Sequence, residues 1–167
     1  MRRLPALLVL LSLGACLAPL RPIVSLEPGV SLKGYHVVVV GPVTDRSGYP
    51  FRYPMQDSVR ARIVDELRQK GLKVASVNTD TAAPVLFVVS SVDRFKSGAL
   101  AVQSPNAVGS SGCTVSSRLM DGHSGKRLGE IVASELTDPD DTQAMSPFAL
   151  LMTCARMVAD EIGHQLH

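Results

Sequence analysis

The chain has 167 residues, of which 46% are hydrophobic and only 4% are aromatic, with no tryptophan. Its 17 Lys and Arg residues against 15 Asp and Glu give a formal net charge of +2. This near-neutral charge argues against a broad nucleic-acid footprint. The scarcity of aromatic side chains argues against surfaces that stack on sugars or on single-stranded bases.

Residues 1–16 have the pattern of an export signal. Two arginines follow Met1, an apolar run extends from Leu4 to Leu13, and small residues precede Cys16. A basic head, a short apolar stretch and a small-residue exit are typical of a secretory signal. The apolar run is also shorter than the roughly 20 residues that a membrane-spanning helix needs.

The stretch Leu13-Gly14-Ala15-Cys16 resembles the lipobox of bacterial lipoproteins. That resemblance implies a signal peptide over residues 1–15, cleavage before Cys16, and acylation of the sulfur and new amino group of Cys16, as with palmitate. A plain secretory signal with an incidental Cys16 and an uncleaved anchor are the alternatives. An Asp after the lipidated cysteine would imply retention at the inner membrane. Leu17 stands there instead, so we expect a lipid-anchored protein of the Gram-negative outer membrane that faces the periplasm.

Residues 17–33 contain Pro19, Pro22, Pro28 and Gly29 and show neither a helical nor an alternating period. They predict a flexible tether after the lipidated cysteine, over residues 16–33. The globular domain is then expected over residues 34–167. Without residues 1–15, which include Arg2 and Arg3, the chain has 15 basic and 15 acidic residues, and its length suits one domain.

The first half of this domain predicts a β-α-β unit. His36 to Gly41 contains four consecutive valines, typical of a strand buried on both faces. Residues 55–70 repeat apolar side chains every four positions and predict an amphipathic helix, with Gly71 suited to end it. Residues 72–77 predict the next strand, and such a crossover is nearly always right-handed and parallel.

The second half predicts a strand, a hairpin and a long helix. Residues 85–92 form an apolar run typical of a central strand, while 99–102 is either an edge strand or loop, and Ser104 to Gly112 is a flexible loop. Two strands, 115–120 and 128–136, flank the turn residues 121–125. Ser146-Pro147 predicts the start of a helix that extends to Leu166. The sequence thus predicts a single α/β domain with a mixed sheet and two helices packed on it.

The last helix carries more apolar surface than one sheet contact requires. Its main stripe comprises Phe148, Leu151, Met152, Ala155, Val158, Ala159, Ile162 and Leu166. A second row comprises Leu150, Cys154 and Met157. Either the first helix covers this row, or the row binds a partner protein.

Cys113 and Cys154 remain as a pair if Cys16 is acylated. In an oxidising compartment they form a possible disulfide. The alternative is two buried free thiols, because free cysteine is among the most buried residue types.

No catalytic motif emerges from the sequence. It contains no nucleophile elbow, no phosphate loop and no dinucleotide fingerprint, and His36, His123, His164 and His167 are scattered. We therefore expect no enzyme activity, no metal and no cofactor. The alternative is a small-ligand binder or an envelope hydrolase with a site at the strand ends, near Asp45, Asp93 and Asp121, which requires these carboxylates to converge.

The order of several stretches resembles bacterial lipoproteins of the "domain of unknown function 4410" type. The resemblance covers residues 34–166 and rests on Gly34-Tyr35-His36, Leu67 to Leu72, Pro84 to Val89, Asp93-Arg94-Phe95, and Met120-Asp121 followed by Ser124 to Leu128. It implies a fold similar to the curli secretion lipoprotein and to the amino-terminal domain of TolB, and it implies no catalytic residues. We expect a non-enzymatic envelope lipoprotein that contacts a protein partner through the second row of the last helix and the loop Ser104 to Gly112.

Overall fold

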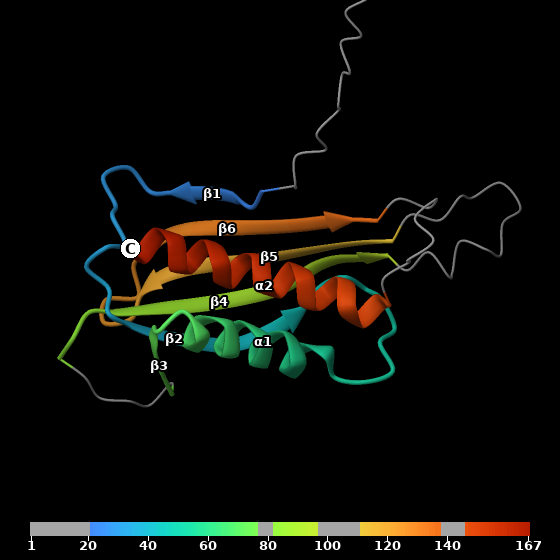
Figure 1. Ribbon diagram of the computed structural model, residues 1–167. Coiled ribbons are helices and arrows are strands. Elements are labelled where there is room, and N and C mark those ends of the chain that lie inside the picture. The colour runs from blue at the N-terminus through green and yellow to red at the C-terminus, as the bar shows by residue number, and fades with distance from the viewer. Residues whose placement is uncertain (1–20, 77–81, 97–110, 138–145) are drawn as a thin grey trace, which may run out of the picture.

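The computed structural model describes residues 21–76, 82–96, 111–137 and 146–167. In this part of the chain a sheet of six strands carries two helices on one face (Figure 1). The elements are β1 (Ile23–Leu26), β2 (Val37–Asp45), α1 (Met55–Gln69), β3 (Lys73–Ala75), β4 (Val85–Lys96), β5 (Gly112–Asp121), β6 (Arg127–Leu136) and α2 (Pro147–Leu166). The strand order is β1-β6-β5-β4-β2-β3. This arrangement confirms the expected single α/β domain.

The predicted β-α-β unit is present. Strand β2 pairs in parallel with β3, and α1 connects them. Helix α1 ends where the sequence indicates, because Gly71 adopts a φ of 77° that a residue with a Cβ rarely adopts. The Leu72 N–H then donates to the carbonyl of Leu67 at 3.1 Å. Strand β4 pairs in parallel with the other edge of β2, so β2 is a central strand, as its valines predict.

Bulges in β2 and β4 keep apolar side chains facing the helices along both strands. The register of β2 shifts between Val40 and Val43, and that of β4 shifts between Val92 and Arg94. An extra residue in a strand reverses the alternation of its side chains. Val43 therefore joins Val38 in the core, and Phe95 joins Val92.

The two helices lie side by side on the same sheet face and begin at the same end of it (Figure 1). Leu67, Leu86, Leu119 and Ile162 are fully buried in the layer between helices and sheet. Lys70 joins the helices, since its ammonium group lies 2.7 Å from Asp160 and its stem crosses Gly163. A Cβ at Gly163 would meet that stem at 2.8 Å, which explains a glycine inside α2.

The expected tether over residues 16–33 is wrong for its second half. Ile23–Leu26 form strand β1, which pairs antiparallel with β6 in the register Ile23↔Val132 to Leu26↔Gly129. Leu32 is 1% exposed and belongs to the core. The folded domain therefore includes residues from Ile23 onward, and not only from Gly34. Residues 1–20, with the expected signal peptide and Cys16, lie outside the described residues.

The second apolar row of α2 is buried. Leu150 and Cys154 are 0% exposed, and Met157 packs against the core. Helix α1 beside α2 and strands β5 and β6 beneath it account for this burial. Leu150 and Cys154 therefore offer no accessible surface for a partner, and Met157 is only partly exposed. Phe148 was predicted to belong to the buried stripe of this helix, but it is 50% exposed. It lies in the first turn of α2, at the end of the helix layer.

Cys113 of β5 and Cys154 of α2 form a disulfide. The two residues are separated by 41 positions, and closing a loop of that size stabilises a fold by about 4 kcal/mol in the chain-entropy account. The bridge joins the helix layer to the centre of the sheet. No helix among the described residues is long and apolar enough to cross a membrane.

Candidate interaction surface

The sheet face without helices is here called the open face. The part of it between β1 and the carboxyl ends of β2 and β4, here called the upper half, is polar. Hydroxyl groups on neighbouring strands pair across it: Ser91 with Ser116 at 3.0 Å, and Thr114 with Ser134 at 3.1 Å. Arg118 stands exposed beside Glu130, its partner in the register. Such cross-strand pairs hold a flat polar surface in place without a layer above it.

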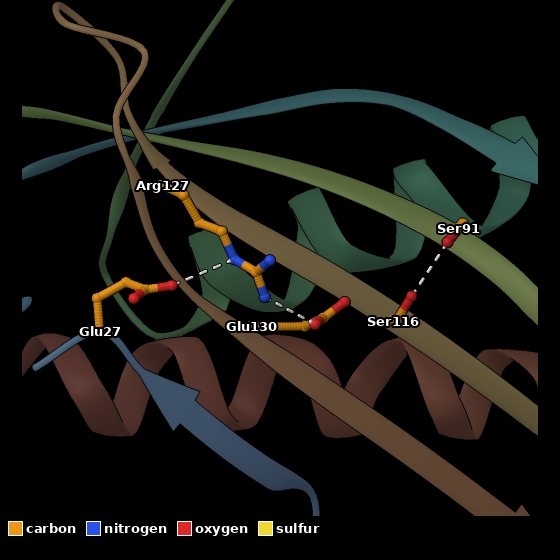
Figure 2. A network of polar contacts seen from close by, with 5 residues as sticks. All are labelled: Glu27, Ser91, Ser116, Arg127 and Glu130. Atoms are coloured by element: carbon orange, nitrogen blue, oxygen red, sulfur yellow. Dashed lines mark hydrogen bonds and ion pairs between the residues drawn. The ribbon is translucent and has the colours of Figure 1, made fainter.

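An ion cluster at the β1 side of this face joins the chain after β1 to β6 (Figure 2). The Arg127 guanidinium lies 3.5 Å from a Glu27 carboxylate oxygen and 3.1 Å from one of Glu130. Each of these side chains is a third to a half exposed, so the pairs contribute little stability. They fix the chain after β1 against β6 and leave charged groups of both signs at the rim of the open face.

The lower half of this face is covered rather than open. Val37, Val39 and Val85 are less than 9% exposed there, and Ala83 and Phe87 pack against them. Ala83 precedes β4 in the connection from β3. The accessible part of the open face is therefore its upper half, between β1 and the carboxyl ends of β2 and β4.

The two ends of the sheet differ in chemistry. Strands β2, β4 and β6 run in the same direction, and α1 and α2 begin where β2 and β6 end (Figure 1). Among the described residues, four large hydrophobic side chains are exposed: Ile23 at 70%, Tyr53 at 75%, Leu136 at 66% and Phe148 at 50%. Tyr53 precedes α1, Leu136 ends β6, and Phe148 is in the first turn of α2. We call these three side chains the apolar end. Ile23 lies elsewhere, because it pairs with Val132, four residues before the end of β6.

A cluster of three aromatic side chains lies at the same end of the sheet as the apolar end. The rings of Tyr49, Phe51 and Phe95 lie 4.7–4.9 Å apart, centre to centre, in tilted and edge-to-face arrangements. Tyr49 and Phe51 come from the connection between β2 and α1, and Phe95 from the end of β4. With Tyr53 and Phe148, five of the seven aromatic residues of the chain lie at this end of the sheet.

A cavity of about 460 Å³ opens at the same end. Its lining includes Arg94 and Lys96 of β4, Thr114 of β5, and Ser134 and Leu136 of β6. The described lining residues include two cations and no carboxylate. The strand ends thus present apolar surface with basic groups beside it.

The opposite end of the sheet is organised by Asp121, at the turn between β5 and β6. One carboxylate oxygen accepts from the Ser124 N–H and hydroxyl, each at 2.7 Å, and the other accepts from the Tyr35 hydroxyl at 2.9 Å. The bonds from Ser124, followed by the one from Tyr35, lower the pKa of Asp121 to about 2. Burial, together with the bond to Asp121, raises the pKa of Tyr35 to about 12. This arrangement locks a turn and gives Asp121 a structural role.

The three aspartates of the alternative ligand site do not converge. Asp45 ends β2 and accepts from the Ser47 N–H and hydroxyl, and Asp93 lies near the end of β4 and accepts from the Ser91 hydroxyl. Asp121 pairs with Leu86, at the other end of β4. The hydrolase version of that site therefore has no geometry to support it. No group of three or more His, Cys, Asp or Glu side chains with metal-binding geometry occurs in the described part of the chain.

The expected partner loop, Ser104 to Gly112, lies outside the described residues up to position 110. Gly112 is the buried first residue of β5. Neither the open face nor the apolar end was singled out from the sequence. Leu136 and Phe148 are of the same residue types as the core, so the sequence does not distinguish them from core residues. They are exposed because they lie at the ends of their strand and helix, where the packed layers stop.

No protein-family model and no curated protein matches the chain. Solved structures are similar in fold. A PelC dodecamer from Paraburkholderia phytofirmans aligns with a TM-score of 0.53 and 13% identity, over 82% of this chain and 96% of that one. A DUF330 protein from Xanthomonas campestris aligns with a TM-score of 0.54 and 13% identity, over 86% and 90%.

A minor lipoprotein from Acinetobacter baumannii also aligns, with a TM-score of 0.47 and 13% identity over 79% of this chain and 92% of that one. At these identities the PelC and DUF330 similarities show a shared bacterial fold and not a shared activity. The resemblance to domain of unknown function 4410, and to the curli and TolB domains, stays a prediction.

Proposed function

We propose that this chain is a lipid-anchored envelope protein of the outer membrane that works by binding another envelope protein and catalyses no reaction. The anchor is Cys16, at the end of the lipobox-like stretch Leu13 to Cys16. Leu17, in the place where an Asp would imply inner-membrane retention, favours the outer membrane. A fold shared with two solved bacterial proteins, PelC and a DUF330 protein, is compatible with this role.

The observation that carries the binding role is the helix-free sheet face. Both helices pack on one side, and the upper half of the open face exposes Arg118 with half-exposed Ser116 and Glu130 around it. Protein interfaces that form and separate are about as polar as ordinary surface, and flat polar sheets with fixed hydroxyl pairs suit them. The surface that we assign to the partner is therefore the open face, in place of the buried row of α2.

Site-specific photo-cross-linking in cells tests this assignment. A photo-reactive phenylalanine analogue at Arg118 places the probe on the open face, and the same analogue at Arg156 places it on the exposed side of α2. Neither side chain has a partner among the described contacts, so both variants should fold. We expect a discrete covalent adduct with one envelope protein from position 118 and none from position 156.

Two results would contradict the proposal. Adducts from position 156 alone would move the interface to the helix layer. An absence of adducts from position 118, with the variant present at normal abundance in the membrane fraction, would remove the open face as a binding surface.

A further inference from the structure

We infer that the apolar end of the domain (Tyr53, Leu136 and Phe148) docks onto the phospholipid bilayer that holds the lipid anchor. This inference rests on the proposed acylation of Cys16. It adds an orientation of the folded domain, with the carboxyl ends of β2, β4 and β6 toward the lipid. In this orientation the open face points along the plane of the bilayer and stays accessible to a partner protein.

The length of chain before β1 brings this end close to the bilayer. Ile23 lies seven positions after Cys16, and a fully extended chain spans at most about 3.5 Å per residue, so the two lie within about 25 Å. Ile23 pairs with Val132, four residues before the end of β6. At about 3.3 Å per residue, Ile23 is roughly 13 Å from the carboxyl end of the sheet.

The direction of β1 selects which end is nearer. Strand β1 runs antiparallel to β6, so it travels away from the end where Leu136 lies. The chain that precedes Ile23 therefore approaches from the apolar end.

The chemistry of the two ends agrees with this orientation. Three of the four exposed large hydrophobic side chains of the described residues belong to the apolar end, and the fourth, Ile23, is the first residue of β1. The opposite end exposes polar residues instead, among them Lys33, His36, His123 and Lys126. Tyrosine and phenylalanine with apolar neighbours are typical of surfaces that enter the boundary between head groups and acyl chains.

Charge plays a secondary part in this docking. Arg94 and Lys96 flank Leu136 in the cavity lining, and their long stems allow the cations to reach lipid phosphates while apolar atoms stay in contact with lipid. Asp138, Asp140 and Asp141, outside the described residues, belong to the connection after β6 and oppose an anionic surface. We therefore expect docking on zwitterionic lipid, driven by the apolar side chains.

The absence of tryptophan from the chain allows a direct test with single-tryptophan reporters. Phe148→Trp and Leu136→Trp place the reporter at the apolar end, and Lys126→Trp is the matched control in the exposed β5–β6 turn. Each lipidated full-length variant is reconstituted into phosphatidylcholine vesicles, with or without phosphatidylcholine brominated near the head of its acyl chain. Flotation of the vesicles reports the anchor, and quenching reports the contact.

We expect bromine to reduce emission about twofold at positions 136 and 148, because interfacial side chains enter about 5–10 Å into the head-group boundary. No quenching is expected at position 126. Leu136→Glu, added to the Phe148→Trp reporter, should reduce quenching while the protein still floats with the vesicles. Flotation without quenching at 136 and 148, or equal quenching at 126, overturns the docking and leaves the anchor standing. A protein that does not float overturns the anchor, and the docking with it.

Discussion

At the scale of single residues, Asp121 shows how a sequence signal is explained by structure. An Asp at the end of a strand, before a short glycine-containing turn, is the most specific part of the resemblance noted above. In the folded protein its carboxylate accepts hydrogen bonds from Ser124, His123 and Tyr35. The first two belong to the turn, and Tyr35 belongs to the connection before β2. The residue closes the polar end of the sheet, and its low pKa records those hydrogen bonds.

Asp121→Asn should therefore weaken the fold in a pH-dependent way. The folded-state pKa of Asp121, about 2, lies below its ordinary value of 3.8, so its charge stabilises the fold above about pH 4. That contribution is lost as the pH falls from about 4 toward 2. We expect the variant to melt about 2–4 °C below the parent at neutral pH, as a loss of about 1 kcal/mol does in a domain of this size.

Thermal melts from pH 7 down to pH 2 check this expectation. The gap between parent and variant should close through the acid range. Arg156→Gln, an exposed change on α2, is the control and should track the parent at every pH. A gap that stays constant down to pH 2 would mean that the carboxylate charge contributes nothing.

At the scale of elements, the parts that were predictable from sequence are those with strong local periodicity. The valine run of β2, the four-residue repeat of α1, the hairpin of β5 and β6 and the capped start of α2 all appear where their patterns indicate. Ser146 even accepts the expected bond from the Ala149 N–H, at 3.1 Å. Local patterns suffice for these elements because each is long enough to repeat its period.

Strand β1 was not predicted from the sequence, and the reason is physical. It has four residues, lies between Pro22 and Pro28, and pairs with residues more than a hundred positions later in the chain. Nothing local distinguishes such a segment from a proline-rich linker. In the proposed lipid-anchored protein, pairing of β1 leaves only a short segment between Cys16 and the folded domain.

Gly129 provides a specific way to release β1. A Cβ at this position would lie 2.6 Å from the Ser25 carbonyl oxygen and 3.0 Å from the Leu26 Cα, both backbone atoms that cannot move independently. We expect Gly129→Ala to destabilise the domain by about 1–3 kcal/mol, the usual cost of overpacking. Residues 23–26 should also exchange their amide hydrogens faster, while those of β5 stay protected.

Urea unfolding and hydrogen exchange measure the two effects. Gly34→Ala is the matched control, since a Cβ there meets no atom within 4 Å and the backbone has no positive φ. Unchanged protection of residues 23–26 in Gly129→Ala would contradict the close approach on which the expectation depends.

At the scale of the whole molecule, the domain has three distinct surfaces. Helices cover one sheet face, the opposite face is polar and partly open, and the sheet ends differ, one apolar and one polar. None of these surfaces follows from composition or spacing, because each depends on where strands and helices stop relative to one another. The buried row of α2 shows the same limit: the sequence could not decide between a neighbouring helix and a partner, and the structure places Leu150 and Cys154 in the core.

In the proposed function, the anchor orients the apolar end toward the membrane and leaves the open face for a partner. The most direct test is the mass of the mature protein, purified from the membranes of cells that make the full chain. The account predicts a polypeptide that begins at Cys16 and carries a diacylglyceryl group and an amide-linked acyl chain on that residue. A chain that begins elsewhere, or at Cys16 without fatty acid, would contradict it.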